Sequence, residues 1–195
     1  MRRLATIAVA TAALAASGSS ASAFFNLLFS PQPGQQQFHR NDPGAEVQIS
    51  PVPRQIVAFR GHAPGTIIVS TSERRLYFVL EGGRAIRYGV GVGRPGFEWS
   101  GVKTVARKAE WPDWTPPPQM LKRRPDLPRF MPGGEDNPLG ARAMYLGGSL
   151  FRIHGSNEPN TIGQAVSSGC IRMTNEDVVD LYERVRVGTK VVVLR

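Results

Sequence analysis

The pattern of hydrophobic positions between residues 66 and 93 predicts three consecutive strands. β-branched and aromatic side chains, which favour extended backbone, are concentrated in three runs: 66–73 (TIIVSTSE), 74–80 (RRLYFVL) and 85–93 (AIRYGVGVG). In the third run the apolar side chains alternate, so that one strand face carries Ile86, Tyr88, Val90 and Val92. Gly82 and Gly83 tolerate a positive φ and predict a tight turn before that run. The segment is therefore expected to form an antiparallel meander.

The last third of the chain predicts further strands and one clear helix. Extended segments are expected at residues 141–146, 149–155 and 189–195. Thr174 or Asn175 can cap a helix, because Asp177 follows Thr174 by three residues as in a capping box. The apolar positions of that helix follow a period of 3.6 and are Val178, Leu181, Tyr182 and Val185. Because strands dominate, the sequence predicts a mostly β fold, either a β-sandwich or an open barrel, with one or two helices.

Residues 94–140 are rich in proline and glycine and show no clear period. An irregular stretch of this length inside a compact domain is uncommon and typically serves as a lid or a binding loop. Trp111 and Trp114 within it either line a groove or cover the core from outside. The pattern leaves both roles open.

The N-terminal 23 residues resemble a secretory signal peptide. Arg2 and Arg3 precede an apolar run that is too short to span a bilayer, and the small residues Ala-Ser-Ala at 21–23 suit cleavage. A retained membrane anchor is the alternative, but we expect no stable membrane insertion after processing. Residues 24–61 have the composition of a mobile linker, with a short strand near the end of 47–59. The folded domain is then expected at 62–195.

Export changes the interpretation of the basic charge. Removing the two arginines of the signal lowers the formal net charge from +9 to +7. In the periplasm or cell envelope, anionic wall polymers, membrane surfaces or substrate carboxylates are more suitable partners than nucleic acid. The charge can equally serve solubility alone.

The segment from Phe151 to Met173 carries the candidate chemistry, because it holds the only cysteine of the chain. An unpaired thiol in an exported protein is either a small buried hydrophobe or a nucleophile in use. His154 lies sixteen residues before Cys170, and histidine is the usual base for a cysteine nucleophile. Gly169 permits a tight turn, so that the amides of Gly169 and Cys170 can converge on an oxyanion. Gly155 or a neighbouring carbonyl can orient the imidazole.

Arg172 follows the cysteine by two residues and shares its face if the backbone is extended. Its guanidinium can hold a substrate carboxylate in a bidentate manner, or it can form a surface ion pair with Glu176 or Asp177. A metal site is disfavoured, because one cysteine and three scattered histidines lack the usual ligand spacing. No cofactor is expected.

Residues 153–193 resemble the catalytic domain of the L,D-transpeptidases, also called the YkuD domain. The resemblance rests on a His-Gly pair, a spacer, and the motif Ser-x-Gly-Cys-x-Arg at residues 167–172. It extends upstream through two further segments, residues 65–96 (GTIIVSTSERRLYFVLEGGRAIRYGVGVGRPG) and residues 137–146 (NPLGARAMYL). The resemblance thus covers about residues 62–195. Ser168 stands where many members of the family carry a second histidine.

The resemblance implies a mostly β, sandwich-like domain with an assigned site. Cys170 would be the nucleophile and His154 the base, with the oxyanion on the backbone at Gly169 and Cys170. Arg172 matches the arginine of the motif, whereas the role of the family's second histidine cannot be carried over to Ser168; Arg172, Ser168 and Tyr145 are our candidates for substrate contacts. The substrates would be peptidoglycan stem peptides, and carbapenems would acylate the thiol.

The resemblance implies a first step in which a stem tetrapeptide acylates Cys170 and releases its terminal D-Ala. An acceptor amine would resolve the thioester in a 3→3 cross-link. Water as acceptor would give an L,D-carboxypeptidase, and a lipoprotein as acceptor would give protein anchoring. A catalytically silent wall-binding domain with a structural cysteine is the third alternative.

Overall fold

The computed structural model describes residues 50–195. The predicted signal peptide and residues 24–49 of the predicted linker lie outside the described residues. Strands dominate the described part of the chain, and they are accompanied by two α-helices and a short 3-10 helix, so that the predicted fold class is confirmed. No helix within residues 50–195 is both long and apolar enough to cross a bilayer.

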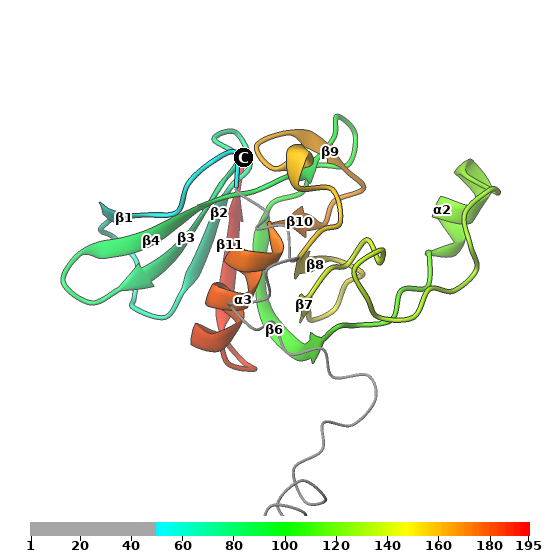
Figure 1. The fold of residues 1–195 in the computed structure, drawn as a ribbon. Helices are drawn as coiled ribbons and strands as arrows, with labels where there is room; N and C mark the ends of the chain where they lie inside the picture. The colour runs from blue at the N-terminus through cyan, green and yellow to red at the C-terminus, as the bar shows by residue number, and fades with distance from the viewer. Residues whose placement is uncertain (1–49) are drawn as a thin grey trace, which may run out of the picture. The chain divides into compact units, whose positions relative to one another are not determined.

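A nine-stranded sheet forms the body of the described chain (Figure 1). Its order is β1 (Gln55–Ala58), β4 (Arg84–Gly89), β3 (Arg75–Leu80), β2 (Ile67–Ser70), β11 (Lys190–Leu194), β6 (Gly101–Glu110), β7 (Arg142–Leu146), β8 (Arg152–His154) and β10 (Ile171–Arg172). A second, two-stranded sheet consists of β5 (Val92–Gly93) and β9 (Ala165–Ser167). The remaining elements are α2 (Pro118–Arg123), η1 (Pro159–Thr161) and α3 (Asn175–Arg184).

The predicted meander is present as antiparallel β2, β3 and β4, with Phe78 paired to both Ile67 and Ile86. The strand expected at 85–93, however, is divided in two. β4 ends at Gly89, and the backbone of Gly91 then exchanges two hydrogen bonds of 2.9 Å with Arg172. β5 therefore pairs with β9 and leaves the meander. This exchange carries the chain from the meander to the segment of the only cysteine.

We predicted an irregular stretch at residues 94–140. This prediction was wrong for residues 101–110, which form β6. Val105 is the only fully buried side chain of this strand, so the sequence lacks an apolar signal for it. Its neighbours determine the structure instead: the first half pairs with β11 and the second half with β7. A register shift between Val105 and Arg107 separates the two halves. In the loop that follows, Trp114 is buried, which fits the covering role rather than an open groove.

The hydrophobic core lies between the sheet and α3, which contacts β7 (Figure 1). Val178 and Leu181 of the helix are fully buried, as the helical period predicts. The Thr174 side chain accepts a hydrogen bond of 3.2 Å from the Asp177 amide, so the predicted cap is confirmed. The cap residue Thr174 follows Cys170 by four residues, so the cap fixes the chain just beyond the cysteine.

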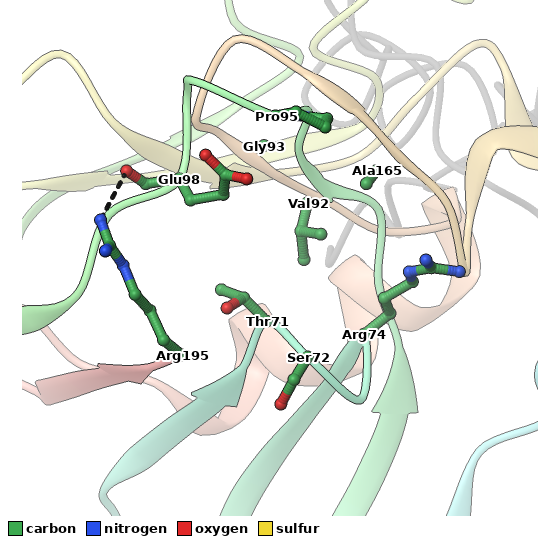
Figure 2. A pocket seen from close by; sticks show the side chains of 9 residues that line it. All are labelled: Thr71, Ser72, Arg74, Val92, Gly93, Pro95, Glu98, Ala165 and Arg195. Atoms are coloured by element: carbon green, nitrogen blue, oxygen red, sulfur yellow. Dashed lines mark hydrogen bonds between the residues drawn. The ribbon is translucent and has the colours of Figure 1, made fainter.

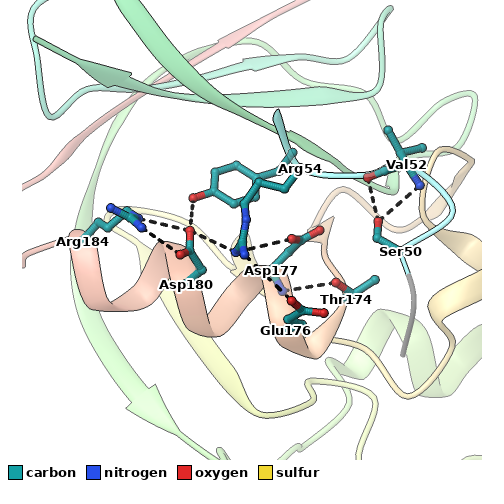
Figure 3. Close-up of polar contacts among 9 residues, drawn as sticks. Ser50, Val52, Arg54, Thr174, Glu176, Asp177, Asp180 and Arg184 are labelled. Atoms are coloured by element: carbon teal, nitrogen blue, oxygen red, sulfur yellow. Dashed lines mark hydrogen bonds and ion pairs between the residues drawn. The ribbon is translucent and has the colours of Figure 1, made fainter. Parts of the chain in front are cut away.

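Polar contacts on one side of α3 connect it to the segment before β1 and to the core (Figure 3). Arg54 Nη1 lies 3.2 Å from Asp180 Oδ2 and 3.8 Å from Asp177 Oδ1. The fully buried Tyr88 donates its hydroxyl to Asp180 Oδ2 at 2.5 Å, and Arg184 binds the same carboxylate through two nitrogens. Asp180 therefore joins one helix, one strand and the N-terminal segment.

Tyr88→Phe is expected to lower the free energy of unfolding by about 1.5–3 kcal/mol, because a hydrogen bond to a charged group is lost inside the core. Tyr77→Phe is the matched control, since its hydroxyl donates to Glu73 Oε2 at 2.7 Å in an exposed position. The control should cost less than about 1 kcal/mol. Urea denaturation of both variants measures the difference, and equal losses would contradict a special role for Asp180.

Candidate active site

The parallel pairing of β8 and β10 brings the cysteine segment beside the histidine strand. Ile171 is paired with Ile153 and Arg172 with His154, and the Met173 amide extends the ladder by donating to His154 O at 2.9 Å. Cys170 directly precedes β10 and is partly exposed. Two segments that lie sixteen residues apart in the sequence are thus neighbours at one end of the sheet.

His154 is buried, with only 4% of its surface exposed. Its Nδ1 lies 2.6 Å from the carbonyl oxygen of Gly155. Since a carbonyl can only accept, Nδ1 carries the proton and Nε2 keeps a free lone pair. The imidazole is thus held as the tautomer that a general base requires.

Burial lowers the pKa of His154 to about 3, and the nearby positive charges of Arg172 and Arg152 act in the same direction. The hydrogen bond to Gly155 opposes the shift and is the weaker effect. The imidazole is therefore neutral near pH 7, in the form that can take a proton.

Asn175 supports the turn after the histidine, a contact that the sequence did not point to. Its Oδ1 accepts from the Ala141 amide at 2.9 Å, and a Cβ added to Gly155 or Gly140 would collide with this oxygen. Glycine is required at both positions because three backbone segments meet there. Asn175 also opens α3, so the helix and the histidine turn are connected.

Three hydrogen bonds fix the turn that carries Cys170. Ser167 Oγ accepts from the Gly169 amide at 3.0 Å and donates to the Cys170 carbonyl at 2.6 Å. The Gly169 carbonyl accepts from Trp99 Nε1 at 2.7 Å. Neither Ser167 nor Trp99 was singled out from the sequence, because their partners depend on the folded loop.

The two amides proposed for the oxyanion are not equivalent in the structure. The N–H of Gly169 is engaged by Ser167 Oγ. Among residues 50–195, the N–H of Cys170 has no hydrogen-bond partner. Cys170 therefore offers the available donor, whereas Gly169 can contribute only by sharing its bond to Ser167.

Arg172 pairs with Glu158, with 2.8 Å between Nη1 and Oε2. The acids expected as its ion-pair partners, Glu176 and Asp177, lie near Arg54 instead, so that expectation was wrong. Since Glu158 contacts only Nη1, the other nitrogens of the guanidinium remain for a further acceptor.

Ser168 and Tyr145 are both in contact with arginines. Ser168 Oγ accepts from Arg94 Nη1 at 3.3 Å. The Tyr145 ring lies 3.6 Å from the Arg107 guanidinium carbon and 5.3 Å from that of Arg152. Tyr145 is paired with Arg152 across β7 and β8, two residues from His154. Each of these two candidate residues therefore lies against at least one arginine.

A cavity of about 470 Å³ lies beside β5 and β9 (Figure 2). None of the predicted site residues lines it; its walls are formed by Thr71, Ser72, Arg74, Val92, Gly93, Pro95, Glu98, Ala165 and Arg195. Within residues 50–195, no cluster of three or more His, Cys, Asp or Glu side chains is arranged to hold a metal ion. Cys170 and His154 thus do not line this cavity.

The model of the L,D-transpeptidase catalytic domain, YkuD, matches residues 64–193. The chain therefore belongs to the L,D-transpeptidase family. The probable L,D-transpeptidase ErfK/SrfK of Escherichia coli K12 is 38% identical over 168 residues, which cover 78% of this chain and 53% of the relative. The chain spans about half the length of the curated relatives it matches.

Solved structures agree with the fold. A crystal structure from Brucella melitensis, described as a probable carnitine operon oxidoreductase, is 48% identical and covers 73% of this chain and 93% of that one, with a TM-score of 0.50. The ertapenem-acylated catalytic domain of an E. faecium L,D-transpeptidase has a TM-score of 0.52 at 22% identity, covering 69% of this chain and 100% of that one.

Gly169→Ala is expected to destabilise the protein more than a glycine substitution at an open position. At Gly169 φ is +105°, and an added Cβ would lie 2.5 Å from Phe151 Cε1. Gly96→Ala is the matched control, with φ of +83° and no atom within 4 Å of its Cβ. The control should cost about 1–3 kcal/mol from backbone strain alone. Urea denaturation of both variants measures the extra cost, and equal losses would show that Phe151 yields freely.

The low pKa of His154 predicts an acid-sensitive fold. In the unfolded chain the His154 imidazole has an ordinary pKa near 6.5 and binds a proton below that pH. In the folded state the imidazole stays neutral down to about pH 3. Stability from neutral His154 is therefore full above pH 6.5 and is lost towards pH 3, by at most about 1.4 kcal/mol per pH unit.

His154→Gln removes this titration while its amide can still donate to Gly155 O. The wild type should exceed this variant in free energy of unfolding by an amount that shrinks as the pH falls from 6.5. Urea denaturation at several pH values measures this difference. Asp177, whose pKa burial raises to about 6, acts in the opposite direction but is common to both proteins and cancels. If the free energies of unfolding of the two proteins varied in parallel with pH, a lowered pKa of His154 would be contradicted.

Proposed function

We propose that the chain is an exported L,D-transpeptidase that joins peptidoglycan stem peptides through a thioester on Cys170. One observation carries the proposal: β10, which starts directly after Cys170, is paired with the strand that ends in a neutral, tautomer-fixed His154. Family membership supports the reaction class, since the matched domain is the catalytic one.

In the first step, Cys170 Sγ attacks the carbonyl carbon at the L-centre of the donor's diamino acid. The thiol proton moves to Nε2 of His154 as the S–C bond forms. The carbonyl oxygen becomes an oxyanion that accepts from the Cys170 N–H. The C–N bond then breaks, and His154 returns the proton to the amine of the departing D-Ala.

In the second step, an acceptor amine attacks the thioester and gives its proton to His154. The C–S bond breaks, Cys170 regains its proton, and a 3→3 cross-link is complete. Water in place of the amine yields a tripeptide, which is the hydrolytic alternative. A lipoprotein amine is a third acceptor of the same chemistry.

Arg172, Ser168 and Tyr145 are our candidates for substrate contacts. Arg172 is 23% exposed at its side chain and has N–H groups beyond the one that Glu158 uses. A carboxylate of the stem peptide suits this guanidinium and the neighbouring arginines of the site. The signal peptide expected at residues 1–23 would deliver the enzyme to the periplasm or cell envelope, where these substrates lie.

The decisive experiment is incubation of the processed protein with tetrapeptide muropeptides, followed by mass spectrometry of the products. Dimers with 3→3 linkage would support transpeptidation, and tripeptides alone would favour the carboxypeptidase. Absence of both, on a folded protein with a slowly labelled thiol, would favour the silent wall-binding alternative.

Carbapenem treatment is expected to add one acyl group, located on the peptide that contains Cys170. The strained carbonyl of the β-lactam replaces the donor peptide bond, and an E. faecium relative has been solved in its ertapenem-acylated form. Intact-mass analysis measures the adduct. It should be absent in Cys170→Ala and should form far more slowly in His154→Ala, with partial recovery at high pH as the thiol ionises unaided. An adduct that persists without Cys170 would contradict the mechanism.

A further inference from the structure

Trp99 connects the loop between β5 and β6 to the turn of the nucleophile. Its indole Nε1 donates to the Gly169 carbonyl at 2.7 Å, across a separation of seventy residues. The indole is stacked on Phe151, with 4.6 Å between centroids and an interplanar angle of 1°. Both rings are only partly buried, although they pack against the core. This pair is thus a platform on which the turn rests.

The carbonyl that Trp99 holds belongs to the same peptide unit as the Cys170 N–H. A peptide unit is planar, and none in the described chain is cis, so its C=O and N–H point in opposite directions. Fixing the Gly169 carbonyl against Trp99 therefore fixes the direction of the Cys170 N–H, which points away from the indole. A donor bound to the carbonyl also polarises the amide and strengthens its N–H as a donor.

The two flanking peptide units are held by a different residue. Ser167 Oγ engages the Gly169 amide on one side and the Cys170 carbonyl on the other. The peptide unit that joins Gly169 to Cys170 lies between these two units. It is bonded by Trp99 and not by Ser167, so its orientation depends on Trp99. Its N–H has no hydrogen-bond partner among residues 50–195, whereas the Gly169 N–H is engaged by Ser167 Oγ. Trp99 thus controls the group that remains for the oxyanion.

Phe151 restricts how the turn can respond. Its ring lies so close to Gly169 that an added Cβ would approach Cε1 to 2.5 Å. The turn therefore cannot move toward the platform. Rotation of the peptide unit remains the free motion, and the indole N–H is the contact that opposes it.

We propose that Trp99 is a positioning residue for acylation, which aims the Cys170 N–H at the developing oxyanion by holding the Gly169 carbonyl. The proposal rests on the acyl transfer proposed above. It assigns to Trp99 a role in the transition state, although the indole itself does not touch the substrate.

The test compares two reactions of the same thiol. Acylation by a carbapenem passes through an oxyanion, whereas alkylation by iodoacetamide does not, and both need thiol deprotonation. Trp99→Phe keeps an aromatic ring on Phe151 but removes the N–H donor. We expect acylation to slow by roughly 10- to 100-fold, less than the 10²–10³-fold typical of deleting an oxyanion donor, while alkylation changes less than about twofold.

Trp114→Phe is the matched control, because it alters a buried tryptophan whose backbone pairs with Met131, away from the turn. It should leave the ratio of the two rates unchanged. If Trp99→Phe folds poorly, 3-benzothienylalanine at position 99 keeps the bicyclic ring and replaces only the N–H by sulfur. It should give the same selective loss.

Equal slowing of both reactions would overturn the proposal, because Trp99 would then act only on the shape or access of the loop. Unchanged acylation in a variant without the N–H would overturn it as well. A wild-type protein that is alkylated but never acylated would instead reject the proposed acyl transfer, and the role of Trp99 in it.

Discussion

Two pairs of residues in parallel register, Ile171 with Ile153 and Arg172 with His154, determine what the rest of the site can do. β10 is only two residues long, and it is held on its other side by the exchange between Gly91 and Arg172. A Cβ added to Gly91 would come within 2.9 Å of Thr161 O, so this approach needs glycine. The short strand is therefore clamped between β8 and the end of the meander, and Cys170 emerges at a defined point.

The same pairing explains the state of the base. Arg172 lies beside His154 in the ladder, and its charge adds to burial in lowering the pKa of the imidazole to about 3. Such an imidazole is a weak base, so a resting thiolate–imidazolium pair is disfavoured, and proton transfer should accompany attack on the carbonyl. Once protonated, however, it is a strong acid that readily gives its proton to a leaving amine. The proposed mechanism thus depends on oxyanion stabilisation to make the first transfer favourable.

Sequence patterns predicted the elements whose apolar periods are local. The meander, the capped helix at Thr174 and the strand ending in His154 all carry such a period, and the structure has each of them. β6 was missed because its side chains are mostly polar and its pairing comes from β11 and β7. Arg172 likewise pairs with Glu158 because the loop that follows β8 brings Glu158 next to β10 in the folded chain. No local sequence pattern encodes this position.

The candidate site shows the same division between residue identity and geometry. Cys170 and His154 were recognisable because a lone thiol and a nearby histidine are chemically unusual together. Ser167 was part of the motif but had no assigned role, since its two bonds require the turn to be closed already. Trp99 lies seventy residues from its partner. A backbone carbonyl has no sequence signature, so any residue that acts by holding one can be found only in the folded chain. The direction of the Cys170 amide is therefore a property of tertiary structure, although the motif supplies the amide itself.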